Sequence, residues 1–289
     1  MKILVPIDFS DRSKKALDVA EKFAPIIGGK VTPFYSHLPI SELDEPYALG
    51  MSSAMYQNFD ELEDILKKRV SELSEEVVDK KYLNEPIIMM GNAAQSIIDI
   101  SDDFDYIIMS SHGRTGFSRF LLGSVSEKVL RLSKIPVMIV ENESDVGEFK
   151  NILVTTDFSD NASGAFPYAV KLAQKTGGTI DLLHVLSFDQ FDDDEKDLSL
   201  RKIREDRLKI LVKEHFQPIS DRVNSKVIIT QGSPHEAIFE HVNENNYNLV
   251  VMATVGRTGI NYLMMGSTTA NVVRHVKSAV LSVNPDLEK

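Results

Sequence analysis

The sequence predicts an α/β protein made of two tandem modules, each an open, mostly parallel five-stranded sheet with helices on both faces. The first observation is internal repetition, because residues 1–35 return as residues 150–184 with the same Asp-Phe-Ser-Asp turn. The second is alternation, since short apolar runs alternate with amphipathic stretches in both copies. Strands that alternate with helices form parallel βα units, which place helices on both faces of one sheet.

The first module begins with an apolar run at 3–7 that ends in the Asp-Phe-Ser-Asp turn, which is typical of a buried strand. Apolar residues then recur with helical spacing over 11–27, and Gly28-Gly29 ends this helix. The next strand, 31–35, contains Pro33. Proline donates no hydrogen bond to a neighbouring strand and is found at edges and bulges, so we expect an irregular strand.

The remaining elements follow from the same two patterns. In the first module they are a helix at 60–80, a strand at 86–90, a helix at 94–100, a strand at 106–110, a helix at 125–132 and a strand at 136–140. The second module has strands at 152–155, 180–185, 226–230, 249–253 and 280–283, and helices near 161–176, 198–217, 234–245 and 268–276. A polar, acidic linker at 141–149 joins a first domain, 1–143, to a second, 150–286.

Two segments differ between the modules, 38–59 in the first and 186–197 in the second. Each follows the second strand of its module at the carboxyl end, where open α/β sheets bind their ligands. Two interpretations stay open for these segments, lids over a ligand and variable surface loops. Surface loops are the commoner outcome for such insertions.

Composition limits the classes of function. Two copies in 289 residues leave roughly 145 residues for each domain, which is an ordinary size. The net charge of −11 argues against nucleic acid as a partner, because binding along its backbone requires a basic surface. Cysteine is absent, which excludes disulfides, thiolate metal sites and cysteine nucleophiles. The sequence shows no signal peptide or apolar span, so we expect a cytoplasmic protein with no membrane partner.

A glycine motif occurs at the same place in both modules. Nine residues separate Gly113 from Gly123-Ser124, and nine separate Gly256 from Gly266-Ser267. In each module a strand leads into the first glycine, and the Gly-Ser pair opens a helix. Glycine lets the main chain approach a ligand closely, and the N–H groups and positive dipole end of a helix start suit phosphate. The motif therefore predicts a phosphate site in each module.

A structural alternative stays open for the first of these helix starts. Ser124 and Glu127 have the spacing of a capping box, in which a serine and a glutamate satisfy the N–H groups of their own helix. The roles of Arg114 and Arg257, which follow the key glycines, also stay open. Each is placed to reach a phosphate, or to pair instead with solvent or a carboxylate.

Other site patterns are absent from the sequence. It contains no Gly-x-x-x-x-Gly-Lys-Ser/Thr loop, no Gly-x-Gly-x-x-Gly turn and no Gly-x-Ser-x-Gly nucleophile elbow. The histidines lack zinc spacing, and the acidic run at 189–197 lacks the spacing of a calcium loop. We therefore predict no metal ligands and no catalytic residue from these patterns.

At the glycine motif the chain resembles the universal stress protein family in its tandem form. The family motif is Gly-x-x-Gly, nine residues, Gly-Ser/Thr; here the small residues Ser110 and Ala253 replace the leading glycine. The resemblance extends to Val-Pro-Ile-Asp-Phe-Ser at 5–10, Leu-Leu-His-Val at 182–185 and Gly-Ser-Pro-His-Glu-Ala-Ile at 232–238. It implies an adenine-nucleotide α-hydrolase-like, Rossmann-like fold whose fifth strands pair the modules into an intramolecular pseudo-dimer. It also permits a homodimer of whole chains.

The resemblance further implies that ATP, with or without Mg²⁺, binds each module. In the first module Asp8 lies at the adenine-ribose end, the backbone of Ser36 meets adenine and Met109 flanks the base. The implied first site comprises Pro6, Ile7, Asp8, Ser36, Met109, Ser110, His112, Gly113, Arg114, Gly123, Ser124 and Val125. The implied second site comprises Thr155, Thr156, Asp157, Val185, Met252, Ala253, Gly256, Arg257, Gly266, Ser267 and Thr268. We prefer the first site slightly, because Pro6 and His112 are not repeated in the second.

Three functions are consistent with the sequence. The first is a stress-response regulatory protein whose conformation, or choice of protein partner, depends on ATP bound in one or both modules. The second is a nucleotide-independent interaction protein with degenerate sites, which the loss of both leading glycines favours. The third is a slow ATPase, for which the sequence offers no positioned general base and no carboxylate pair for magnesium near the motif. We expect the first.

Overall fold

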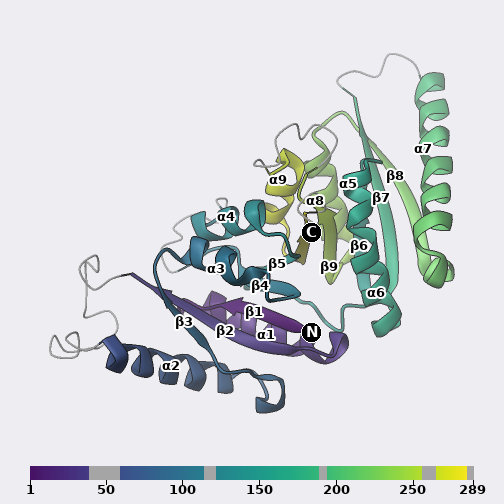
Figure 1. Cartoon of the computed structure of the whole chain (residues 1–289). Helices are drawn as coiled ribbons and strands as arrows, with labels where there is room; N and C mark the ends of the chain where they lie inside the picture. The colour runs from purple at the N-terminus through teal and green to yellow at the C-terminus, as the bar shows by residue number, and fades with distance from the viewer. Residues whose placement is uncertain (39–58, 114–121, 189–193, 256–264, 285–289) are drawn as a thin grey trace.

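The structure is a computed structural model that describes residues 1–38, 59–113, 122–188, 194–255 and 265–284 (Figure 1). Its described strands form a 10-stranded sheet in the order β3-β2-β1-β4-β5-β10-β9-β6-β7-β8. The first five strands of the sequence make one half of this sheet and the last five make the other. The predicted pair of five-stranded sheets is therefore confirmed, and the two join edge to edge into one.

The first half keeps the predicted order of elements. It contains β1 (Lys2–Pro6), α1 (Asp11–Ile27), β2 (Lys30–His37), α2 (Phe59–Glu75), the short 3-10 helix η4 (Lys80–Tyr82), β3 (Ile87–Met90), α3 (Ala93–Ser101), β4 (Tyr106–Ser110), α4 (Ser124–Leu132) and β5 (Val137–Val140). Its strand pairs are all parallel. Local chemistry explains the bounds of α1, because Ser10 accepts a hydrogen bond from the Ser13 N–H at its start and Gly28 ends it in the left-handed conformation.

The second half repeats this order with one change. It contains β6 (Asn151–Thr155), α5 (Asp160–Gly164), α6 (Phe166–Thr176), β7 (Thr179–Ser187), α7 (Asp194–His215), the 3-10 helix η5 (Gln217–Arg222), β8 (Val223–Thr230), α8 (Pro234–Asn245), β9 (Leu249–Ala253), α9 (Ser267–His275) and β10 (Ala279–Val283). The single helix expected near 161–176 is wrong. Pro167 has no N–H and would clash with the preceding turn, so the chain breaks at Ala165 and Pro167 lies in the first turn of α6.

The two halves meet at an antiparallel seam. β5 pairs with β10, and Met138 lies opposite Leu281. Because the strands within each half are parallel, this seam turns the carboxyl ends of the two halves toward opposite edges of the sheet. The pairing of fifth strands that the family resemblance implies is confirmed, and it relates the halves by an approximate two-fold rotation.

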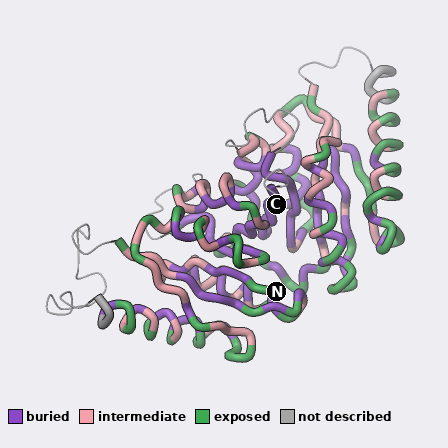
Figure 2. Tube along the Cα trace, viewed as in Figure 1, coloured by how far each residue is buried: buried purple, intermediate pink, exposed green. Residues whose placement is uncertain are grey.

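Helices cover both faces of the sheet, and buried residues continue through both layers (Figure 2). On one face α1, α2, α6 and α7 pack onto strand residues such as Ile3 and Val5. On the other face α3, α4, α8 and α9 pack onto residues such as Leu4 and Ile107. Each of these two clusters contains residues of both halves, so the halves share both cores.

The expectation for Pro33 is wrong. β2 is an interior strand, with β1 on one side and β3 on the other. Pro33 lies opposite Val5 within an unbroken register. The strand tolerates a proline here because its pairing with β3 begins only at Phe34, so the missing N–H of residue 33 leaves no gap in the paired stretch.

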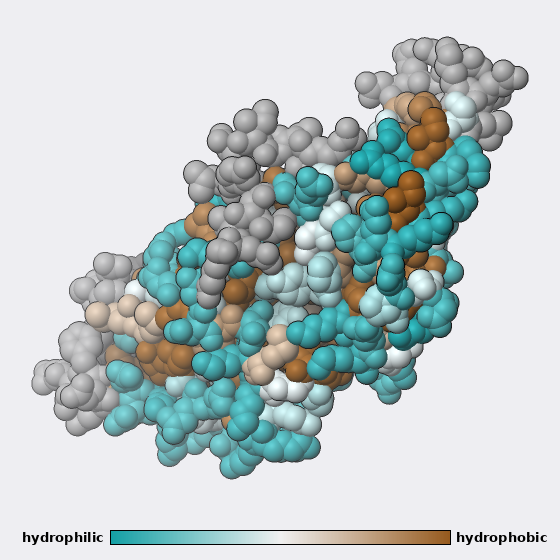
Figure 3. Space-filling model, turned by 45° about the vertical axis from the view of Figure 1, so that its right-hand side comes forward, coloured by the Kyte–Doolittle hydropathy of each residue, from teal (hydrophilic) through white to brown (hydrophobic). Residues whose placement is uncertain are grey.

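α7 lies at the outer end of the second half and presents one side to solvent (Figure 1). Its inner side packs through Leu208, which is fully buried. Ile203 and Ile210, two helical turns apart, are 57% and 53% exposed, and Figure 3 shows hydrophobic patches over this helix among hydrophilic residues. Across the described ranges, none of the helices is long and apolar enough to cross a membrane.

The two segments that differ between the modules fall partly outside the described residues. Of 38–59, positions 39–58 are not described, and of 186–197, positions 189–193 are not. The alternatives of lids and surface loops therefore stay predictions. The same applies to the acidic run at 189–197 and its predicted lack of a calcium site.

Candidate functional site

Two equivalent pockets lie at the carboxyl ends of the strands, one in each half. The first, of about 200 Å³, lies where β1 and β4 diverge, and the second, of about 280 Å³, lies where β6 and β9 diverge. In an open α/β sheet this is the point at which the strand order reverses, and it is where such folds bind ligands. The strand order within each half thus places a pocket beside each predicted glycine motif.

The structure brings nearly all of the predicted site residues to these pockets. The first is lined by the predicted residues Pro6, Ile7, Asp8, Ser36, Met109, Ser110, His112, Gly113, Gly123, Ser124 and Val125. The second is lined by the predicted residues Thr155, Thr156, Asp157, Val185, Met252, Ala253, Gly266, Ser267 and Thr268. The three others, Arg114, Gly256 and Arg257, lie outside the described residues. Whether the lining residues bind a ligand stays a prediction.

The helix that starts at the first pocket has no side-chain cap. Gly123 is the N-cap of α4, and its carbonyl accepts the first helical hydrogen bond, from the Glu127 N–H at 2.8 Å. Its own N–H donates to the carbonyl of Ser111 at 2.8 Å. The next three N–H groups, those of Ser124, Val125 and Ser126, have no acceptor among the described residues. All three residues line the first pocket.

The second pocket has the same arrangement. Gly266 caps α9 without a side-chain hydrogen bond, its N–H donates to the carbonyl of Thr254 at 2.9 Å, and its carbonyl accepts from the Ala270 N–H at 2.9 Å. The N–H groups of the first turn therefore lack partners among the described residues here too. Two helix starts with the same unpaired donors indicate a shared capacity to hold an anion.

The capping-box alternative for Ser124 is wrong. The N-cap of α4 is Gly123, and Ser124 is the first residue inside the helix. No side chain of the described residues accepts a hydrogen bond from the first-turn N–H groups at this helix start. Other helices at the carboxyl edges are capped: Ser10, Asn92 and Ser159 each accept from a backbone N–H, and Ser233 with Glu236 forms a complete capping box at α8. The chain thus caps the neighbouring helices and leaves α4 and α9 open at the pockets.

A hydroxyl fixes each open helix to the strand beside it. Ser126 Oγ donates to the carbonyl of Ser110 at 2.8 Å, and Thr269 Oγ1 donates to the carbonyl of Ala253 at the same distance. Both hydroxyls are buried. These two bonds fix the first turn of each helix to the end of β4 or β9. The sequence motif did not identify Ser126 or Thr269 as site residues.

A carboxylate faces each pocket from the end of the first strand. Oδ1 of Asp8 accepts from the Ser10 hydroxyl at 2.5 Å and from the Ser10 N–H at 3.1 Å. Asp157 makes the same two bonds with Ser159, at 2.5 and 3.0 Å. Gly113 packs so closely that a Cβ there would lie 2.8 Å from Oδ2 of Asp8. The carboxylate is therefore held in one orientation, and glycine is needed beside it.

Apolar side chains form the remaining walls. Met109 and Met252 are buried at equivalent positions of β4 and β9. The neighbouring helices add residues that the sequence analysis missed: Ala93 and Ile97 from α3 and Pro234 and Ile238 from α8. The missed strand residues are Phe34, Tyr35 and Leu183, and the missed residues elsewhere are Ala162 and Val255. Helical spacing marks the helix residues as core, and only the fold shows that the core ends at a pocket.

His112, which lines the first pocket, belongs to a polar cluster, whereas Val255 takes its place in the second pocket. Ser111 Oγ lies 2.7 Å from Nδ1 of His112, and the Ser111 hydroxyl also hydrogen-bonds Glu141. Burial lowers the pKa of His112, and the nearby Arg12 lowers it further, so the imidazole is neutral at pH 7. Burial raises the pKa of Glu141. Nε2 of His112 is buried without a hydrogen-bond partner in the described ranges.

The residues that replace the family's leading glycine are accommodated. Ser110 is nearly buried, and its hydroxyl donates to the carbonyl of His112 at 2.9 Å, within the turn that follows β4. Ala253 has no polar side-chain atom and is similarly buried. In both halves the substitute packs into the turn beside the pocket, so the pocket stays open.

Comparison with known proteins adds to this geometry. The model of the universal stress protein family matches residues 1–141 and again residues 148–284. The universal stress protein MJ0577 of Methanocaldococcus jannaschii is 30% identical over 155 residues, which are 50% of this chain and 96% of that protein. A universal stress protein of Mycolicibacterium smegmatis is 22% identical over 98% of this chain and 97% of its own length. The crystal structure of a universal stress protein from Archaeoglobus fulgidus, 26% identical, superposes with a TM-score of 0.67 and covers 98% of this chain and 96% of that one.

Proposed function

The chain belongs to the universal stress protein family, and on that basis we propose that it is a stress-response regulatory protein that binds an adenine nucleotide, ATP, in the pocket of each half. One observation carries this proposal. The first-turn N–H groups of α4 and α9 are unpaired among the described residues, whereas neighbouring helices at the same edges are capped. Unpaired N–H groups at a helix start are suited to phosphate.

The charges in each pocket determine the orientation of the nucleotide. A triphosphate is attracted by the positive end of the α4 or α9 dipole and repelled by the carboxylate of Asp8 or Asp157. The ribose hydroxyls therefore lie toward the carboxylate, where they donate hydrogen bonds, and the phosphates lie toward the helix. The base then packs against the apolar walls, near Met109 in the first half and Met252 in the second.

We propose that Mg²⁺ enters with the triphosphate. Each pocket presents one carboxylate among its described lining residues, Asp8 or Asp157. Magnesium is usually held by one or two carboxylates together with phosphate oxygens and water, so these residues fit a metal that the nucleotide supplies. In this proposal the bound nucleotide biases the conformation or partner choice of the protein in the cytoplasm and is not primarily a substrate for hydrolysis.

Equilibrium dialysis with radiolabelled ATP and Mg²⁺ tests the proposal. We expect saturable binding by the native chain and about 100-fold weaker binding by the double variant Ser124→Asp with Ser267→Asp, because each new carboxylate lies at the expected phosphate position. The double variant should unfold at the same temperature or higher, since an acidic residue in the first turn suits the helix dipole.

The matched control is Ser124→Asn with Ser267→Asn, which changes size without charge and should retain most of the affinity. Absence of saturable binding by the native chain at about 1 mM ATP would reject the proposal in favour of a nucleotide-independent interaction protein. Equal loss in the Asp and Asn variants would also count against it, because the effect would then be one of shape.

A further inference from the structure

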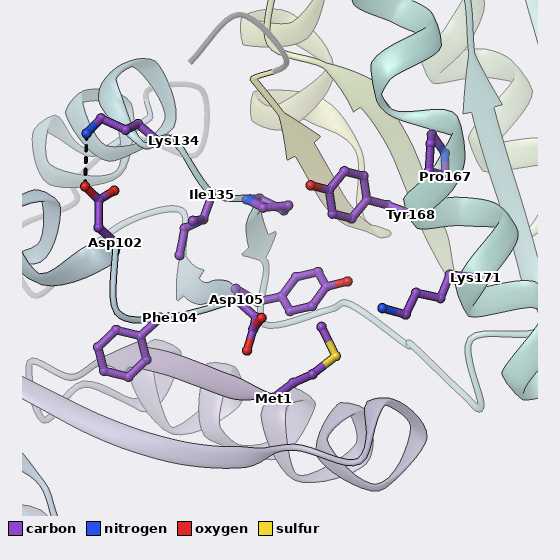
Figure 4. Close-up of a pocket in the computed structure, with 11 residues that line it drawn as sticks. Met1, Asp102, Phe104, Asp105, Lys134, Ile135, Pro167, Tyr168 and Lys171 are labelled. Carbon is purple, nitrogen blue, oxygen red and sulfur yellow. Dashed lines mark hydrogen bonds and ion pairs between the residues drawn. The ribbon is translucent and has the colours of Figure 1, made fainter. Parts of the chain in front are cut away.

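A cleft opens between the two halves, at the amino-terminal edge of the first-half strands. Its volume is about 560 Å³, and its walls come from Met1, Asp105 and Lys134 of the first half and from Tyr168 and Lys171 of α6. Figure 4 shows Lys171 extending from α6 toward Met1 and Asp105, while Lys134 pairs with Asp102 at 3.0 Å on the far side. This cleft lies at the opposite edge of the first half from its nucleotide pocket.

The two-fold rotation gives this cleft an equivalent in the second half. Asp105 and Asn248 occupy matching positions, because each accepts a hydrogen bond from the N–H at the start of the neighbouring strand: Lys2 to Asp105 at 2.6 Å and Asn151 to Asn248 at 3.1 Å. The reverse backbone bonds also match, at 2.9 Å from Asp105 to Lys2 and 2.8 Å from Asn248 to Asn151.

The equivalent cleft is filled by the linker between the halves. Ser144 Oγ donates to the carbonyl of Lys277 at 2.6 Å, and Asn248 Nδ2 donates to the carbonyl of Asp145 at 3.4 Å. Val146 and Phe149 are both 0% exposed, and the Phe149 ring packs edge-on against Phe23 with 5.4 Å between the centroids. One cleft of the pair is therefore built to hold an acidic peptide segment with two buried apolar side chains.

The first cleft has no such occupant among the described residues. Asp105 is exposed, whereas its equivalent Asn248 is half-buried beneath the linker. Lys171 is also exposed and has no hydrogen-bond or ion-pair partner in the described part of the chain. The side chains of Asp105 and Lys171 are therefore in place to contact a bound segment and face solvent.

We propose that this open cleft binds an extended acidic peptide segment of a partner protein, in the manner in which the linker occupies the equivalent cleft. The linker carries Glu141, Glu143, Asp145 and Glu148 around its two buried apolar residues. A partner segment of the same kind places an acidic group near Lys171 and apolar side chains against Tyr168. The proposal is independent of nucleotide binding, because the cleft shares no residue with either pocket.

One substitution between the two clefts determines what the partner must offer. Asn248 donates its amide N–H to a linker carbonyl, but Asp105 is a carboxylate and can only accept. A partner segment therefore presents an N–H group, and not a carbonyl, to residue 105. The linker's own sequence consequently fits the open cleft imperfectly, and changing residue 105 to asparagine improves the fit.

The probe is a fluorescein-labelled synthetic peptide with the sequence of residues 141–149, titrated with the full-length chain and followed by fluorescence anisotropy. We expect weak saturable binding by the native chain, about fivefold tighter binding by Asp105→Asn, and at least tenfold weaker binding by Lys171→Glu. Lys22→Glu is the matched control, because Lys22 of α1 is the repeat equivalent of Lys171 and pairs with Asp18 of its own helix at 3.2 Å. It should leave binding unchanged.

Three outcomes would overturn the proposal. The first is absence of saturable binding by both the native chain and Asp105→Asn at about 1 mM protein. The second is equal loss in Lys22→Glu and Lys171→Glu, which would show that the peptide displaces the linker. The third is binding that arises only after residues 285–289 are removed, which would assign the cleft to the chain's own C-terminal segment. Circular dichroism of each variant separates these outcomes from misfolding.

Discussion

The two pockets of this protein share a backbone and differ in their side chains. Both have an uncapped helix start, an oriented carboxylate and a hydroxyl that ties the helix to its strand at 2.8 Å. Around this framework the first pocket has Ser36 and His112 where the second has Val185 and Val255. The second is larger, about 280 Å³ against about 200 Å³. The comparison teaches that the donors proposed to bind phosphate are main-chain groups, which are the same in both halves although the side chains around them differ.

The largest expected effect separates the two pockets. Ser124→Asp should weaken ATP binding in the first half alone by about 100-fold, and Ser267→Asp should do the same in the second half alone. Isothermal titration calorimetry of each single variant should show one site lost and one retained. If either variant loses both sites, the halves are coupled and the description of two independent pockets fails.

A smaller effect is expected at Gly113. A Cβ at this position would lie 2.8 Å from Oδ2 of Asp8, so Gly113→Ala should turn the carboxylate away from the ribose hydroxyls. We expect about tenfold weaker ATP binding, corresponding to the loss of one charge-assisted hydrogen bond. ATP affinity is measured in the Ser267→Asp variant, in which we expect only the first pocket to bind ATP. Unchanged affinity there would place the ribose away from Asp8.

The hydroxyl hydrogen bonds of Ser126 and Thr269 test whether the two pocket frameworks contribute equally to stability. Removing a buried hydrogen bond costs about 1 kcal/mol of the free energy of unfolding, and Ser126→Ala and Thr269→Val each remove one bond of the same length. Urea denaturation should therefore show similar losses in the two variants. A loss in one variant more than about 1 kcal/mol above the other would mean that the two frameworks are not energetically equivalent.

The smallest effect concerns pH and only the first half. Because burial lowers the pKa of His112, the unfolded chain takes up this proton first as the pH falls below about 6.5. The stability that neutral His112 contributes is therefore present above that pH and is lost as the pH falls toward its lowered native pKa. His112→Val, which copies Val255, should make the melting temperature less sensitive to pH between about 7.5 and 5.5. An identical pH profile in the variant would contradict this assignment.

Glu141 affects the pH dependence of stability in the opposite direction to His112 and over a different pH range. Burial raises its pKa, so the stability associated with its protonated form is present below its ordinary pKa and is lost as the pH rises through the raised value. Comparing the native chain with His112→Val at each pH isolates the contribution of the histidine, provided that the pKa of Glu141 is the same in both proteins.

The order of strands and helices was predictable from the sequence because apolar residues are spaced differently in strands and in helices. The apolar runs of β1 and β4 are buried on both faces, and the helices repeat apolar residues every three or four positions. The predictions failed where a neighbour decides the outcome. Pro33, for example, is tolerated within β2 because of where β3 begins to pair. The break at Ala165 is different, because Pro167 is a local signal that interrupts a helix which apolar spacing alone would continue.

The candidate site was predictable only in part for the same reason. The glycine spacing located the pockets, yet both Gly123 and Ser124 are suitable N-cap residues. Gly123 takes that place, with its N–H bonded to the carbonyl of Ser111, which is a contact between segments. The walls from α3 and α8, and the burial of Val146 and Phe149 in an acidic linker, likewise depend on packing that no local pattern encodes.

The antiparallel seam between β5 and β10 has a consequence for signalling geometry. Since the strands of the two halves run in opposite directions at the seam, the two pockets lie at opposite edges of the continuous sheet. They also share no lining residue. Under the function that we propose, each pocket would therefore present its own bound nucleotide to protein partners separately.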